Sequence, residues 1–343
     1  MDIGVVLLRI AIGVGVGAGC ATAGPVRVAG PGVALVEWQF PLEADADGLR
    51  AHPHQRALTE DPHHAAMRPA FFPALSDENQ SETAHMMNKL TRHARQVSQS
   101  FGAGRESSMP PFLLNISAVL PDALEHLIAH EAVRILSFSS GSKSRLAGLD
   151  ALLVAHPEVV LVAATPHISG NHDSVELLAE RPSILAARGV PNVVLAGCLA
   201  FYEDGVEADR AGQPLGSRDN PFSIDNQPVQ VEAPQVFMMN CRSGASFAPG
   251  AGATSAAAPH LANLLALIGE RLAARGAPPT AGEMLAGLAA VTHRAWAREK
   301  TGEVHEVRYF TLDTILVNAG RPLVTEAIWG VFEAHPAPLR IAP

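Results

Sequence analysis

The sequence predicts an α/β fold of three layers, in which a mostly parallel central sheet carries helices on both faces. Short continuous apolar runs recur along the chain, which is typical of strands that are buried on both sides. Segments with helical spacing alternate with these runs, and that alternation favours βαβ units. Small polar turns follow several of the runs, at the sheet edge where parallel α/β folds place their ligands.

The first predicted strand is Val33–Val36, and it runs directly into Glu37. A carboxylate at the carboxyl end of a buried strand points into the crevice where such folds bind ligands, although an ordinary surface glutamate after a strand gives the same pattern. The next predicted elements are a strand at 112–116, a helix at 121–132 and a strand at 134–138, which ends in the small polar turn 139–142.

The chain then continues the same alternation. A helix at 146–155 leads to a strand at 159–164, which opens into a polar loop that contains Asn171. A helix at 174–188 and a strand at 192–197 follow, and this strand closes the predicted series. Because no repeat or internal linker is visible, we expect residues 31–343 to form one domain after an N-terminal extension at 1–30.

Ser255 lies where a glycine-rich loop becomes a long apolar helix. The helical pattern begins after Thr254 and ends before Gly276 and Pro278, which is how helices commonly stop. Free backbone N–H groups and the positive end of the dipole favour an anion at such a helix start. A hydroxyl at this position suits a nucleophile whose product is an oxyanion, and it equally suits a helix cap.

Composition excludes several classes of protein. The chain has 343 residues and a formal charge of -9, which gives no support to nucleic-acid binding. No run is long and clean enough to span a membrane. The cysteines Cys20, Cys198 and Cys241 form no disulfide framework or zinc pattern by spacing, so we expect small buried side chains.

The N-terminal segment leaves the location of the protein open. Residues 3–16 are mostly apolar and 21–23 resemble a cleavage site, which is the pattern of a signal peptide. Asp2 replaces the usual basic start and Arg9 interrupts the apolar run, so we lean towards a cytoplasmic protein while an exported form stays open.

Histidines supply the candidate bases and one candidate metal site. His85 and His93 compete as functional residues within a helical segment that starts near Asp77. The histidines between 52 and 64 have metal-like spacing, but no neighbouring cysteine or carboxylate completes a site, so a solvated loop is expected. We therefore predict no required cofactor or metal, and a structural calcium site would leave no spacing signature here.

Five segments in order resemble the subtilases, the subtilisin-like serine peptidases. The segment 254–260 resembles the Gly-Thr-Ser-x-Ala-x-Pro-His signature around the nucleophile of that family. Val33–Glu37 is similar to the strand that ends in the acid, and His93–Val97 to the segment of the base. Ile135–Gly141 resembles the strand and turn that grip the substrate, and Val162–Asn171 the oxyanion loop. The resemblance covers roughly residues 32–319.

The resemblance implies a subtilisin-like fold and a serine endopeptidase that acts on peptides or proteins. The implied triad is Glu37, His93 and Ser255, as acid, base and nucleophile. It further implies that Asn171 and the Ser255 N–H bind the oxyanion, and that Ser139, Ser140 and Gly141 bind the substrate backbone.

The departures from the family pattern keep alternatives open. Glu37 stands where the family has Asp, Arg95 where it has a small Thr, and Ala253 where it has Gly. His85 remains a rival to His93 as the base. A subtilase-fold protein that binds peptides without cutting them is the second hypothesis. An unrelated α/β-hydrolase is disfavoured because no Gly-x-Ser-x-Gly turn surrounds Ser255.

Overall fold

The fold is described from a computed structural model. It describes residues 30–37, 93–94, 97, 100–101, 111–115, 120–139, 148–165, 185, 189–199, 216–223, 236–240, 253–298 and 302–310. All structural statements below concern these residues.

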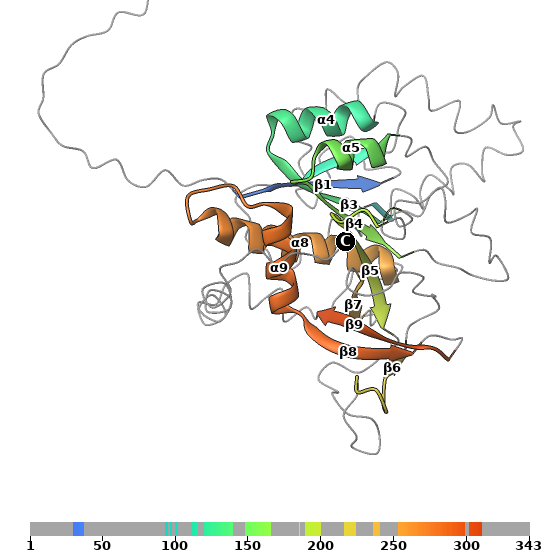
Figure 1. The fold of residues 1–343 in the computed structure, drawn as a ribbon. Helices are drawn as coiled ribbons and strands as arrows, with labels where there is room; N and C mark the ends of the chain where they lie inside the picture. The colour runs from blue at the N-terminus through green and yellow to red at the C-terminus, as the bar shows by residue number, and fades with distance from the viewer. Residues whose placement is uncertain are drawn as a thin grey trace, which may run out of the picture.

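The described strands form one mixed sheet in the order β2-β1-β3-β4-β5-β7-β9-β8-β6 (Figure 1). Every neighbouring pair is parallel except β8 and β9, which form an antiparallel pair. The strands are β1 (Gly32–Glu37), β2 (Phe112–Asn115), β3 (Val133–Phe138), β4 (Val160–Ala164), β5 (Val193–Leu199), β6 (Phe222–Ser223), β7 (Val236–Asn240), β8 (His293–Arg298) and β9 (Val304–Phe310).

Helices cover both faces of this sheet. On one face lie α4 (Leu120–His130) and α5 (Leu149–Ala155), and on the other lie α8 (Ala253–Ala273) and α9 (Ala281–Val291) (Figure 1). Side chains alternate between the faces along each strand: Leu35 packs in the core cluster beneath α8, whereas Val36 packs in the cluster beneath α4 and α5. Strands buried on both faces explain why the sequence shows continuous apolar runs.

The predicted class, an α/β fold with a mostly parallel sheet between two helical layers, is confirmed. The strands predicted around Val33–Val36, 112–116, 134–138 and 159–164 are present with small shifts at their ends. The prediction that the strand at 192–197 closes the series is wrong, because β7 lies parallel to β5 and β9 parallel to β7. The late hairpin was not predicted, although β8 contains Trp296 and β9 contains Val304, Val307, Tyr309 and Phe310, which favour strands.

Cys198 departs from the expectation of an isolated buried side chain. It is buried in the cluster beneath α8 and is disulfide-bonded, to a partner outside the described residues. Spacing along the chain does not reveal such a bond, because parallel strands bring together residues separated by long connections. Among the described helices, none is long and apolar enough to cross a membrane.

Gly269 allows α8 to approach the start of β1 and α9 closely. A Cβ atom at this position would lie 2.8 Å from Pro31 Cδ and 3.2 Å from Met284 Sδ. We expect Gly269→Ala to destabilise the fold by roughly 1–3 kcal/mol through overpacking, although alanine is the better helix former by about 1 kcal/mol. Chemical denaturation of both proteins measures the difference.

Gly282 provides the control for that substitution. It is an exposed helical glycine in α9, and the nearest atom to an added Cβ would be Thr280 Oγ1 at 4.0 Å. Gly282→Ala should therefore be neutral or stabilising. Equal effects of the two substitutions would contradict the close packing of Gly269.

Candidate active site

Glu37 is a fully buried carboxylate at the carboxyl end of β1. Its strand lies between β2 and β3, and alternation along β1 places Glu37 on the same face as Val33 and Leu35, beneath α8. Burying a carboxylate is costly unless polar partners surround it, so its position demands specific contacts. The continuous apolar run Val33–Val36 explains how the strand is driven into the core with a charged group at its end.

His93 provides one such contact. Its Nδ1 atom lies 3.2 Å from Glu37 Oε2, and the imidazole is partly exposed while the carboxylate is not. Ala94, Val97, Ser100 and Phe101 are helical like His93, and we call these five described residues the His93 helix. The last four are buried at helical spacing, so this segment holds His93 at the protein surface above an apolar face.

The carboxylate selects the tautomer of His93. A carboxylate only accepts hydrogen bonds, so this contact requires the proton on Nδ1. In the neutral ring the Nε2 atom then carries no proton, which is the form that can accept one. The contact with Glu37 therefore orients the imidazole.

Ser255 lies in the first turn of α8, as the sequence predicts. It is partly buried, follows the buried Thr254, and precedes a run of fully buried helical residues. Its hydroxyl donates to the main-chain oxygen of Ser139, directly after β3, with a distance of 3.0 Å. The first turn also offers backbone N–H groups that no helical carbonyl accepts.

Ser139 joins this region from the carboxyl end of β3, next to β1 in the sheet. Its side chain is 3% exposed, and its hydroxyl has no hydrogen-bond partner within the described part of the chain. Glu37 and Ser139 therefore lie at the carboxyl ends of adjacent strands, with His93 against one and Ser255 against the other. The edge predicted from the sequence is thus where these four residues gather.

Several predicted site residues lie outside the described residues. They are Asn171, Ser140, Gly141, the rival base His85, and the histidines between 52 and 64. Within the described residues, no group of His, Cys, Asp or Glu side chains has the arrangement of a metal site.

His260 is a further titratable group beside the site, in α8 after Ser255. Its side chain is fully buried, and desolvation lowers its pKa from 6.5 to about 4. It is therefore neutral at physiological pH and belongs to the packed side of α8.

Fold and site together define an α/β protein with an oriented Glu–His pair and a serine hydroxyl at the carboxyl edge of a parallel sheet. Among solved structures, the chain is similar to the patellamide maturation protease PatA, with 18% identity, 84% of this chain and 97% of that chain covered, and a TM-score of 0.41. It is also similar to the PatG macrocyclase in complex with peptide, with 13% identity, 76% and 82% covered, and a TM-score of 0.39.

The sequence matches no protein-family model and no curated protein.

Proposed function

We propose that the chain is a subtilisin-like serine endopeptidase whose triad is Glu37, His93 and Ser255. The observation that carries the proposal is the 3.2 Å contact between His93 Nδ1 and the buried Glu37 carboxylate. A buried acid that orients an exposed imidazole is the arrangement by which serine peptidases generate a base. Burial of the Glu37 carboxylate demands polar partners, and the imidazole of His93 is one of them.

In the proposed reaction, Ser255 Oγ attacks the scissile carbonyl carbon and His93 Nε2 takes the hydroxyl proton. Glu37 holds the ring and stabilises the imidazolium that forms. The imidazolium then donates its proton to the leaving amine, which gives an acyl-enzyme that water hydrolyses by the same route. The Ser255 N–H and the Asn171 side chain donate to the oxyanion.

The substrate in this proposal is a peptide or protein in an extended conformation. Ser139, Ser140 and Gly141 follow β3 and would offer main-chain groups to the substrate as an added strand. The Ser139 carbonyl that now accepts the Ser255 hydroxyl lies within this segment. Binding of the substrate backbone would therefore involve the same carbonyl that contacts the Ser255 hydroxyl.

One contact favours the alternative, a protein that binds peptides without cleaving them. Ser255 donates to the Ser139 carbonyl, and a hydroxyl has a single proton, so in this arrangement that proton is not given to His93. Rotation about the serine Cα–Cβ bond is fast, with a timescale of about picoseconds to nanoseconds, so the contact delays no reaction. We therefore retain the peptidase as the first proposal.

A fluorophosphonate probe separates the two functions. We expect one covalent adduct, located by peptide mapping at Ser255, with labelling lost in Ser255→Ala and strongly reduced in His93→Ala. Absence of labelling in folded wild-type protein would overturn the peptidase proposal. Retention of labelling in His93→Ala would overturn His93 as the base and direct attention to His85.

A further inference from the structure

A fully buried amide joins the His93 helix to the helix that carries Ser255. Asn263 Nδ2, on α8, donates to the main-chain oxygen of Phe101 with a distance of 2.8 Å, and the Asn263 side chain is 0% exposed. Phe101 packs in the same core cluster as the apolar face of α8. The hydrogen bond therefore crosses a dry interface between two helices.

The bond lies at the same number of residues from Ser255 on α8 as from His93 on the other segment. Asn263 follows Ser255 by eight residues, and Phe101 follows His93 by eight residues. Eight residues correspond to about 12 Å, slightly more than two turns, along a helix axis. The bond thus forms a cross-link at equal distance from the two residues whose separation decides whether a proton can pass between them.

An amide side chain is suited to fixing the position of one helix against another. Apolar side chains resist separation of two helices but tolerate sliding and rotation, because dispersion has little directionality. A hydrogen bond from a buried donor fixes distance and direction, and its loss leaves a buried carbonyl without that donor, which is unfavourable. The interface therefore has one preferred register.

We propose that Asn263 is a positioning residue that fixes the His93 helix against α8 and so sets the position of His93 relative to Ser255. The effect of Asn263 on catalysis rests on the proposed function, whereas its role in holding the two helices together does not. Asn263 has no contact with substrate in this proposal and acts only through the two helices.

Asn192 offers a matched control on the opposite face of the sheet. It is also a buried asparagine, and its Nδ2 donates to the main-chain oxygens of Val159 at 2.7 Å and Leu153 at 3.2 Å. These contacts support α5 and the start of β4, away from the His93 helix. Asn192→Leu removes the same kind of hydrogen bond without touching the interface of α8.

The test compares Asn263→Leu, Asn263→Ala and Asn263→Gln with Asn192→Leu in the full-length chain. Leucine keeps the number and branching of the side-chain heavy atoms but is bulkier, alanine removes the amide without adding atoms, and glutamine retains a donor on a longer arm. We expect the rate of fluorophosphonate labelling at Ser255 to fall about ten- to hundredfold in the leucine and alanine variants, with partial recovery in glutamine. Asn192→Leu should label within about twofold of wild type, even where its loss of thermal stability is equal.

A second measurement does not depend on activity. The low-field Nδ1 proton resonance of His93, seen by NMR, reports its contact with Glu37 and should shift or broaden in the Asn263 variants and not in Asn192→Leu. Unchanged labelling and an unchanged resonance in the Asn263 variants would overturn the inference, as would equal changes in Asn192→Leu. Absence of labelling in wild type would instead overturn the proposed function, and the resonance would still decide the role of Asn263.

Discussion

Replacing Glu37 with glutamine is expected to reduce turnover and fluorophosphonate labelling by roughly 10⁴-fold, the size of effect that amide replacement of the acid has in other serine peptidases. The amide has nearly the same shape, so the 3.2 Å contact with His93 Nδ1 can persist. Its NH₂ group is a donor, however, and when it faces Nδ1 it selects the tautomer with the proton on Nε2. That tautomer cannot accept the proton of Ser255.

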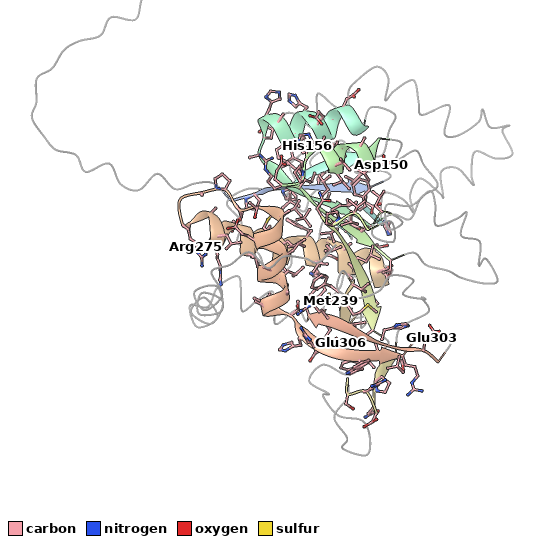
Figure 2. The ribbon with its side chains drawn as sticks, in the orientation of Figure 1. Asp150, His156, Met239, Arg275, Glu303 and Glu306 are labelled. Carbon is pink, nitrogen blue, oxygen red and sulfur yellow. The ribbon has the colours of Figure 1, made fainter. Side chains whose placement is uncertain are left out.

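Two further variants show whether the effect comes from orientation of the imidazole. Glu37→Asp keeps the charge and removes one methylene, and it should reduce turnover less than Glu37→Gln does. Glu158→Gln removes a carboxylate that lies at the same 3.2 Å from His156 Nδ1 and should leave turnover unchanged. His156 lies at the end of α5, on the opposite face of the sheet (Figure 2). Thermal melts check folding, and a Glu37→Gln protein that is folded and fully active would refute the triad.

Loss of stability in mild acid is the second large effect that we expect. Burial lowers the pKa of His260 to about 4 in the folded protein, against 6.5 for an accessible histidine. Between these values the unfolded chain binds a proton that the folded chain does not, so stability falls as the pH falls through this window. At about 1.4 kcal/mol per pKa unit, His260 alone contributes a loss of about 3 kcal/mol from pH 7 to pH 4.

Denaturant unfolding at several pH values measures this contribution. His260→Gln removes the titrating group, so the stability of the variant should depend less steeply on pH between 6.5 and 4, whatever its stability at pH 7. The same pH dependence in the variant and in wild type would show that the pKa of His260 is the same in the folded and unfolded chain, as for an accessible histidine. The substitution lies in α8, so each labelling assay with it needs a matched folding control.

Local sequence signals predicted the parts of the site that a single segment determines. The apolar run before Glu37 predicted a strand with an acid at its end, and the change from glycines to leucines predicted Ser255 at a helix start. Both signals are contained within a few residues, where propensity and periodicity act. The choice between His93 and His85 depends on which helix turn faces β1, and that is decided by tertiary packing alone.

The remaining features depend on contacts between distant segments. Asn263 looked like one polar residue within an apolar helix, and only its contact with Phe101 shows why it is there. Two strand signals are local: the apolar run Val236–Met239 of β7, and the valine and aromatic residues of β9. The pairing of β9 with β8 and β7 depends on tertiary contacts.

The contacts of the candidate site span long stretches of chain, and this affects when the site assembles during synthesis. Glu37 and His93 are 56 residues apart, and Ser139 and Ser255 are 116 residues apart. A nascent chain therefore carries the acid, the base and the edge of the sheet well before the serine leaves the ribosome. Because parallel sheets rich in distant contacts assemble slowly, we expect these four residues to come together only when α8 docks on the sheet.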